Sequence, residues 1–295
     1  MLRARVSLLV AVLVVLVVPA HAQMVSPFHI LPVVAKVAGA AGTNWMTSMS
    51  VSNVSDETVN VTAMFFRENT NNQPFSGTEH TFSIPGGRTL TVDDVLGSWF
   101  PAQGSTKGFL ILMAEAASGG DDALLAVMAR IFNNADPNAT YGQVVPSNFI
   151  SFVFGHGTAV MPGARWDGQT RSNIGVVNLS FQPLQVLVTV YDANGSVVSS
   201  MTKQVSTFSL AQWSLAQLGV STLSTPGRVE VVVDPATISW DPCDPLTWGP
   251  GASPGLFMAY ISRVDQVTGD AEFAYAQNDW SDFVAECGSE PDDCP

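Results

Sequence analysis

Two stretches of the sequence, 125 positions apart, repeat one alternation of apolar and polar residues. They read SVSNVSDETVNVTAMFF at residues 50–66 and GVVNLSFQPLQVLVTVY at residues 175–191. In the first stretch every second residue from Val59 is apolar, and the second stretch repeats this pattern from Leu184. A period of two residues gives a β-strand one buried face. Turn-forming residues precede that strand in both stretches, so each stretch encodes a strand, a turn and a second strand.

Later segments repeat in the same order, which indicates an internal duplication. TKGFLILMAE parallels TPGRVEVVVD, and LLAVMARIFNN parallels FMAYISRVDQ, an alignment that matches Arg130 with Arg263. Asn53 and Asn178 follow equivalent strands. Because asparagine side chains hydrogen-bond readily to nearby backbone, we predict that both cap a turn.

The alternating segments predict an all-β fold. Strands that lack long helices to cover them must bury one face against another sheet. We therefore predict two tandem β-sandwiches, each with roughly six to eight short strands separated by Gly, Pro, Asn and Asp. A single continuous barrel is the alternative, and the duplication disfavours it.

Two short segments favour helical turns. The first is VDDVLGSWF, in which Asp93 and Asp94 suit the first turn, where negative charge is stabilised. The second is LAQWSLAQLG, which follows Ser209. Both segments precede a glycine-led strand, so we expect them at the same place in each sandwich.

LPVVAKV, GTNWMTSMSVSN and GGRTLTVDDVLG follow one another ahead of the first glycine-led strand. In this order the segments resemble secreted bacterial proteins built of tandem immunoglobulin-like or fibronectin-like modules, over residues 30–276. The resemblance implies tandem immunoglobulin-like β-sandwiches. It implies no particular activity, because one fold supports many functions.

The first residues are typical of a secretory leader. Arg3 and Arg5 precede an apolar run at residues 6–18, and an A-x-A cleavage site follows at residues 20–22. The run is shorter than the roughly 20 residues that a membrane-spanning helix needs. We therefore predict a signal peptide over residues 1–22 and no membrane span after its cleavage.

After the leader we expect one sandwich over residues 23–155, a second over residues 156–280, and an acidic, cysteine-containing tail over residues 281–295. The three cysteines of the chain lie in its last part. They are Cys243, Cys287 and Cys294. Export favours a disulfide among them. The three possible pairings stay open, and a bridge from Cys243 to the tail is preferred.

The composition disfavours several classes of function. A net charge of −13 without a basic cluster disfavours binding to nucleic acid. His29, His80 and His156 stand in no metal-binding spacing. We therefore expect no enzymatic activity, no catalytic residue and no cofactor.

One long segment distinguishes the second unit from the first. PATISWDPCDPLTWGPGASPG, residues 235–255, stands where the first unit has only a short turn. Trp240 and Trp248 are candidates for a binding surface, because exposed tryptophan beside polar groups is common at interfaces. Asp241 and Asp244 are candidate calcium ligands. The alternative is that both tryptophans cover the open end of the sandwich.

These observations favour a non-catalytic, secreted or cell-surface protein with a structural or interaction role, such as an adhesin or a matrix component. We expect it outside the cell, with the periplasm as an alternative location. Its partners would be other proteins or glycans. Two alternatives stay open: a glycan-binding module that uses the tryptophan segment, and a filament subunit that assembles through exposed strand edges.

Overall fold

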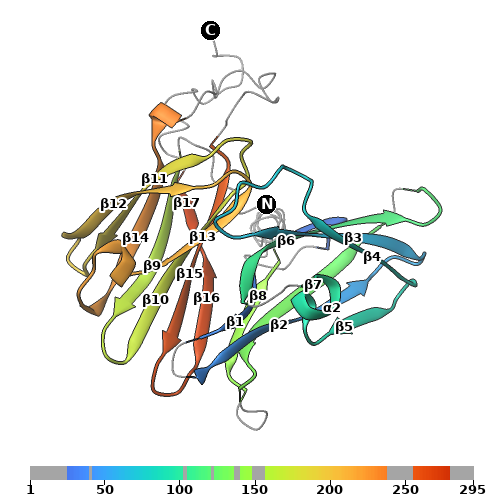
Figure 1. Ribbon diagram of the computed structural model, residues 1–295, viewed down its shortest axis with the longest axis horizontal. Helices are drawn as coiled ribbons and strands as arrows, with labels where there is room; N and C mark the ends of the chain where they lie inside the picture. The colour runs from blue at the N-terminus through green and yellow to red at the C-terminus, as the bar shows by residue number, and fades with distance from the viewer. Residues whose placement is uncertain are drawn as a thin grey trace, which may run out of the picture.

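The computed structural model describes residues 25–39, 42–101, 105–120, 123–135, 140–147, 157–237 and 255–279 (Figure 1). Antiparallel strands make up most of the described chain, and its helices are single short turns. The fold is all-β, with two tandem β-sandwiches, as the alternating pattern predicts.

The first unit has eight strands and one short helix. They are β1 (Phe28–Ala38), β2 (Asn44–Asn53), β3 (Val59–Arg67), β4 (Thr78–Ile84), β5 (Thr89–Val92), α2 (Val95–Trp99), β6 (Thr106–Ala116), β7 (Leu125–Asn133) and β8 (Gly142–Pro146). The strands form one sheet in the order β4-β3-β6-β1-β2-β7-β8, and β5 also pairs with β2. This sheet folds into two layers at β2, because the start of β2 pairs with β1 and its end pairs with β5.

The second unit repeats these elements. They are β9 (Thr158–Trp166), β10 (Thr170–Asn178), β11 (Leu184–Tyr191), β12 (Val197–Val205), β13 (Ser209–Ser214), η2 (Ala216–Leu218), β14 (Leu223–Val233), η3 (Pro235–Thr237), β15 (Phe257–Asp265), β16 (Ala271–Tyr275) and β17 (Gln277–Asp279). Here the two layers are separate sheets, in the orders β12-β11-β14-β9-β17 and β13-β10-β15-β16.

The two units share one strand topology. Adding eight to each strand number of the layers β4-β3-β6-β1 and β5-β2-β7-β8 gives the corresponding layers of the second unit, to which β17 is added. Asn53 lies opposite Leu125, and Asn178 lies opposite Phe257. This register corrects the sequence alignment by one residue, because it matches Arg130 with Ser262 and not with Arg263.

The repeated asparagines cap equivalent turns, as predicted. Asn53 Oδ1 accepts a hydrogen bond from the Ser55 amide at 2.9 Å, and Asn178 Oδ1 accepts one from the Ser180 amide at 2.7 Å. Each Nδ2 also donates to two or more backbone carbonyls, including one at or just beyond the end of the fourth strand of its unit. Both asparagines therefore tie one layer of the sandwich to the other.

The helical segments lie between equivalent strands, but the structure differs from the prediction in detail. In α2, Asp94 is the N-cap residue, and its carboxylate accepts from the Gly97 amide at 2.8 Å. The first turn of α2 contains no acidic residue. In the second unit the first half of LAQWSLAQLG belongs to β13, and only Ala216–Leu218 forms a 3-10 turn. Leu210 and Ala211 are adjacent on the strand and pack into different apolar layers, because successive side chains of a strand point to opposite faces.

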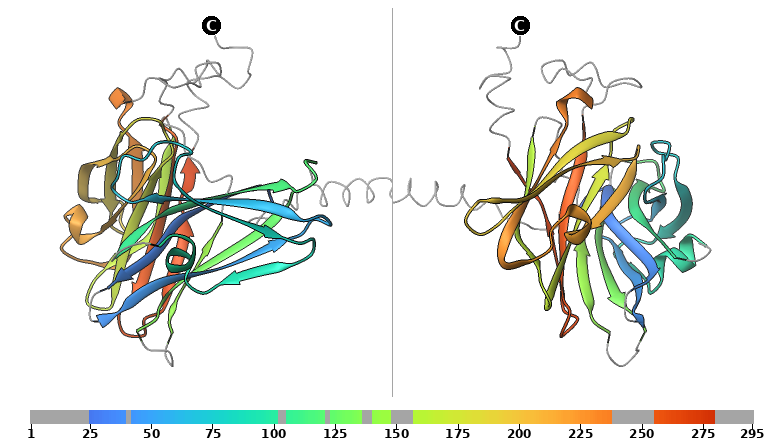
Figure 2. Two further views of the ribbon diagram at one scale, coloured as in Figure 1. Left: turned by 45° about the vertical axis from the view of Figure 1, so that its right-hand side comes forward. Right: turned by 60° about the vertical axis from the view of Figure 1, so that its left-hand side comes forward.

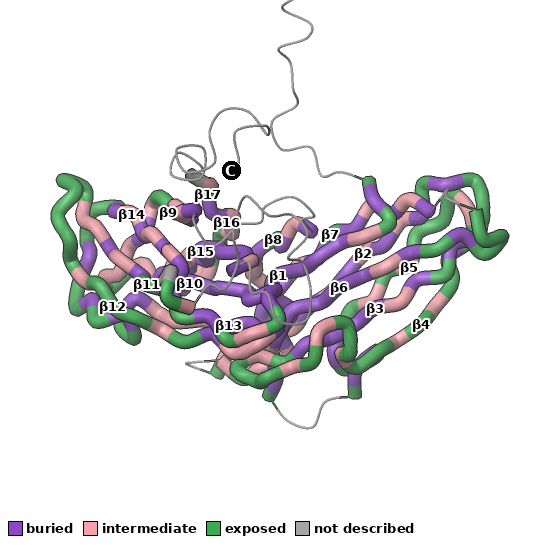
Figure 3. Tube along the Cα trace, turned by 90° about the horizontal axis from the view of Figure 1, so that it is seen from above, coloured by how far each residue is buried: buried purple, intermediate pink, exposed green. Residues whose placement is uncertain are grey.

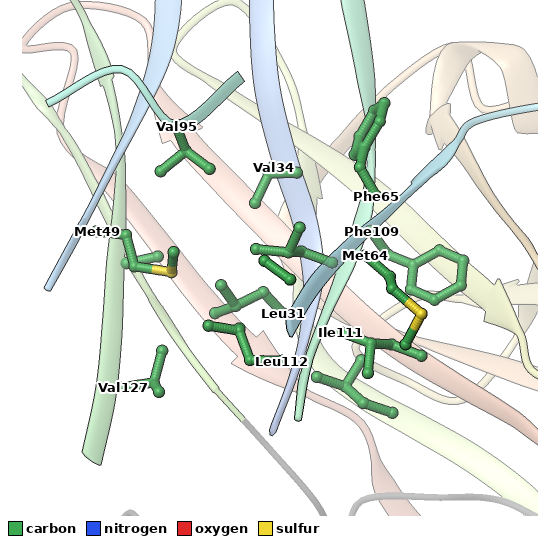
Figure 4. Packing of buried hydrophobic residues seen from close by; sticks show 14 of the residues in the cluster. Leu31, Val34, Met49, Met64, Phe65, Val95, Phe109, Ile111, Leu112 and Val127 are labelled. Atoms are coloured by element: carbon green, nitrogen blue, oxygen red, sulfur yellow. The ribbon is translucent and has the colours of Figure 1, made fainter. Parts of the chain in front are cut away.

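Each sandwich buries an apolar layer between its own sheets. In the first unit Leu31 and Leu112 point toward Met49 and Val127 (Figure 4). In the second unit the cluster joins β9, β11 and β14 to β10, β13 and β15. A third apolar layer lies between the two units.

This inter-unit layer uses the outer faces of two sheets. Met64, Phe109 and Ile111 lie on the opposite side of the first-unit sheet from Met49 and Val127 (Figure 4). They belong to the same cluster as six residues of the second unit, which are Val177, Leu179, Phe208, Leu210, Met258 and Tyr260. The hydrophobic clusters therefore do not divide at residues 155 and 156.

The units lie against each other with their strands crossing (Figure 2). Buried residues fill the middle of the molecule, where β10, β13 and β15 meet β1 and β6, and exposed residues gather at its outer ends (Figure 3). The molecule is therefore four stacked β-layers, with the third apolar core at its centre.

Candidate binding sites

The residues that the sequence singles out for binding lie outside the described chain. These are Trp240, Trp248, Asp241, Asp244, Cys243, Cys287 and Cys294. The signal peptide at residues 1–22 and the tail at residues 281–295 also lie outside it. The described residues direct attention to the contact between the two units.

The loop between β3 and β4 is hydrogen-bonded to the second unit. The Asn69 amide donates to the Leu210 carbonyl at 2.9 Å, and Asn72 Nδ2 donates to the Phe208 carbonyl at 2.9 Å. Phe208 has a φ of 47°, in the left-handed region that bulky residues rarely adopt. These bonds and the packing of its ring hold Phe208 in that conformation.

Three phenylalanine rings meet at this place. Phe208 of the second unit contacts Phe66 edge-on at 4.8 Å between ring centroids and Phe109 at 5.5 Å. Phe66 and Phe109 stack on each other at 4.8 Å. Aromatic pairs of this kind contribute beyond their buried area, so the cluster is an anchor of the inter-unit contact.

The inter-unit layer opens into a cavity of about 130 Å³, hereafter the inter-unit cavity. Its apolar wall includes Val33 and Trp45 from the first unit and Val264 from the second. Its polar lining residues are Lys107, Gln143, Arg171, Asn173, Gln212 and Ser262.

Most of the polar contacts in the cavity join one unit to the other. Lys107 Nζ donates to Gln212 Oε1 at 2.9 Å and forms an ion pair with Glu68 at 3.2 Å. Ser262 Oγ donates to Gln143 Oε1 at 2.9 Å. These side chains are therefore engaged in holding the two sheets together.

Arg171 is the exception. It lies on β10, and its Nε atom is buried without a hydrogen-bond partner among the described residues. No carboxylate lines the cavity, and no ion pair joins Arg171 to a described acidic residue. A buried donor without a partner is costly, so this guanidinium marks the cavity as a candidate site.

A second hollow of about 310 Å³ lies on the surface of the second unit. Its two arginines already have acidic partners, since Arg263 contacts Glu272 at 2.6 Å and Arg165 contacts Asp167 at 2.6 Å. Arg263 also donates to the Gly163 carbonyl at 3.1 Å. The arginines of this hollow are therefore engaged within the fold.

Aromatic rings also gather along β4 at the outer end of the first unit. The His80 ring stacks on Trp99 at 5.2 Å, and Phe82 packs on the same indole at 4.7 Å. Trp99 is buried and comes from α2. These rings close the end of the sandwich, so their role is packing.

His29 is buried on β1 and fully hydrogen-bonded. Its Nε2 lies 3.0 Å from the Ser26 carbonyl and 2.9 Å from the Leu125 carbonyl, so we assign the proton to Nε2. Nδ1 lies 3.0 Å from Ser147 Oγ, and this hydroxyl can donate its one proton either to Nδ1 or to the Val127 carbonyl, which is also 3.0 Å away. Burial lowers the pKa of His29, while the two carbonyl contacts oppose this shift. This geometry suits a neutral structural histidine.

Among the residues that the structure describes, no group of three or more acidic, histidine or cysteine side chains is placed to hold a metal ion. Within the same residues, no helix has the length and apolar character to span a membrane.

Sequence reasoning missed Arg171 and the inter-unit cavity. Alternation along β10 places Arg171 and Val177 on one face and Ile174 on the other. Val177 could have predicted part of this, because apolar residues on both faces of a strand indicate that both faces are covered. The face that carries Val177 is opposite the one that carries Ile174. The sequence does not say which strands cover the Val177 face.

No family model and no curated protein sequence matches the chain. Among solved structures, a glycosyl hydrolase family 2 member from Bacteroides cellulosilyticus DSM 14838 has a TM-score of 0.20 and 9% identity, and the match covers 84% of this chain and 27% of that chain. A beta-glucuronidase of Bacteroides uniformis has a TM-score of 0.16 and 12% identity, with 79% and 26% covered. The chain spans about a quarter of the length of these enzymes. TM-scores this low relate neither their fold nor their activity to this chain.

Proposed function

We propose that this chain is a non-catalytic structural or interaction protein, secreted or held at the cell surface, whose two sandwiches act as one rigid body. The buried layer between the units carries this proposal. It fixes the outer faces of the two sandwiches relative to each other, which suits a spacer or a docking platform and is not needed in two independently moving modules.

The outer face of the first unit is consistent with such a role. Small hydroxyl side chains pair across it, with Ser52 and Thr89 at 2.8 Å and Ser50 and Thr91 at 3.3 Å. Met128, on the neighbouring strand, is 50% exposed. A flat face of this composition carries little charge and can lie against another surface with a low desolvation cost.

The location is tested in the producing cell. Fractionation of the cell, with antibody labelling of intact cells, should recover a chain that lacks residues 1–22 in the envelope or the medium. Retention of the full-length chain in the cytosol would overturn the proposal.

A second candidate function is assembly of the chain with copies of itself. Among the described strands β12 pairs only with β11, so its other edge is unpaired. Val197 on this strand is 59% exposed and Val198 is 38% exposed. A long, unpaired edge strand with exposed apolar side chains can pair with another chain.

Substitution at this edge tests the assembly. Thr202 and Leu187 are cross-strand neighbours on β12 and β11. Thr202→Lys places a charge on the edge strand itself and should shift the protein toward monomer in light scattering at high concentration. Leu187→Lys, one strand further in, is the matched control. A wild-type protein that is monomeric throughout would contradict the assembly.

A further inference from the structure

We propose that the inter-unit cavity binds a small monocarboxylate with a compact apolar body, and that Arg171 holds the carboxylate group. The inference goes beyond the proposed function, because it concerns a ligand between the units and not a partner on the outer faces. It rests on the size of the cavity, its unmatched charge and its apolar wall.

The size limits the ligand. The cavity measures about 130 Å³, and an apolar cavity of roughly 150 Å³ is known to accept benzene. A ring of that size or a short aliphatic chain therefore fits inside it.

The charge selects an anion. Arg171 contributes a positive charge to the cavity; among the described residues it forms no ion pair, and none of the described acidic side chains lines the cavity. The other cation, Lys107, is already paired with Glu68. One charge thus remains to be matched in a chain whose net charge is −13. A guanidinium binds a carboxylate with two parallel hydrogen bonds.

The wall selects the rest of the molecule. Val33 and Trp45 line the cavity from the first unit, and Val264 and Ala271 line it from the second. These side chains can contact an apolar ring or chain but offer no hydrogen bonds to one. Among the described residues that line the cavity, one cation lacks an acidic partner, and one cation beside an apolar wall fits a monocarboxylate better than a dicarboxylate or a phosphate.

A ligand in this place would contact both units. Arg171 comes from β10, whereas Trp45 comes from β2. Binding would therefore stabilise the inter-unit contact as well as the folded chain, because a ligand that binds only the folded state raises its stability.

The test uses the purified chain and two carboxylate probes, benzoate and butyrate, with benzamide as the neutral analogue of benzoate. Isothermal titration should show saturable binding of at least one carboxylate. Benzamide should bind at least about 10-fold more weakly, because it lacks the charge-assisted hydrogen bond. In NMR spectra, the indole N–H signal of Trp45, assigned with Trp45→Phe, should shift on addition of the bound carboxylate.

Three variants complete the test. Arg171→Gln should weaken carboxylate binding at least about 10-fold. Arg88→Gln removes an exposed arginine from the turn before β5 and should leave the affinity unchanged. Ala271→Leu fills the cavity while it keeps Arg171, and should weaken binding if Arg171→Gln fails to fold. Equal binding of benzoate and benzamide, or no saturable binding of either carboxylate to the folded wild-type chain, would overturn the proposal.

Discussion

His29 shows how a single titratable side chain makes the stability of this fold depend on pH. Burial lowers its pKa below the usual value near 6.5. Above that value the ring is neutral in both the folded and the unfolded chain. As the pH falls through about 6.5, His29 becomes protonated in the unfolded chain but stays neutral in the folded chain. The free energy of unfolding therefore decreases on acidification until the folded-state pKa is passed.

The variant His29→Gln should lose less stability than the wild type between pH 7.5 and pH 5. The measurement is urea unfolding at both pH values, with the difference between the two taken for each protein. His80→Gln, which removes a half-exposed histidine from β4, reports any effect common to histidine loss. An identical pH dependence in His29→Gln and the wild type would show that His29 does not carry this coupling.

At the scale of elements, the asparagine turns make each sandwich a closed unit. Asn53 and Asn178 are 1% and 0% exposed, and each amide group bonds to the backbone of the turn and of the opposite layer. Buried carbonyls that lose such a donor remain unsatisfied, at a cost of about 1–3 kcal/mol each. The two turns therefore stabilise the second-to-third strand connection and the contact between layers together.

Asn53→Ala and Asn178→Ala should each lower the free energy of unfolding by about 2–4 kcal/mol, because one buried and at least one partly buried carbonyl lose their donor. Chemical denaturation of both variants measures this. The control is Asn194→Ala, which alters an exposed turn residue and should cost less than about 1 kcal/mol. A small effect at Asn53 combined with a large effect at Asn178 would show that the two turns are not equivalent.

Most of the strands and both asparagine turns could be predicted from the sequence. The period of two residues located the strands, and the repeat located the equivalent asparagines, because both features are local. The LAQWSLAQLG segment was misassigned because Leu210, Trp213 and Leu218 fit a helical spacing as well as a strand followed by a turn. The Arg130–Arg263 alignment failed because a loop-length difference shifts the register by one residue, which faint similarity does not detect.

At the scale of the whole molecule, the inter-unit layer joins the units into one body. Met64 and Phe66 lie on the face of β3 opposite Val59, and the second unit covers them. Which sheet covers which face depends on contacts between residues more than a hundred positions apart, and no local pattern specifies them. The cavity could not be predicted for the same reason, since Arg171 and Lys107 meet only after the two sheets pack.

Phe208→Ala should destabilise the folded chain by about 3–5 kcal/mol, because it removes a buried ring from the contact with Phe66 and Phe109. Phe181→Ala is the matched control. The Phe181 side chain is 45% exposed, and we expect a cost below about 1 kcal/mol. Calorimetry measures both variants, and the wild type should unfold in one transition. Equal costs for the two variants would show that the inter-unit cluster contributes little.

The inter-unit layer also constrains the order in which the chain can mature. The ribosome completes β6 well before it reaches β15. The apolar outer face of the first unit is therefore exposed to water until the second unit has been synthesised. A nascent or truncated first half would expose Phe66, Phe109 and Ile111 to other chains and would aggregate readily. Each unit therefore needs the other, or another protein surface in its place, to cover its apolar outer face. Deleting one unit or expressing one alone would leave that face exposed to water.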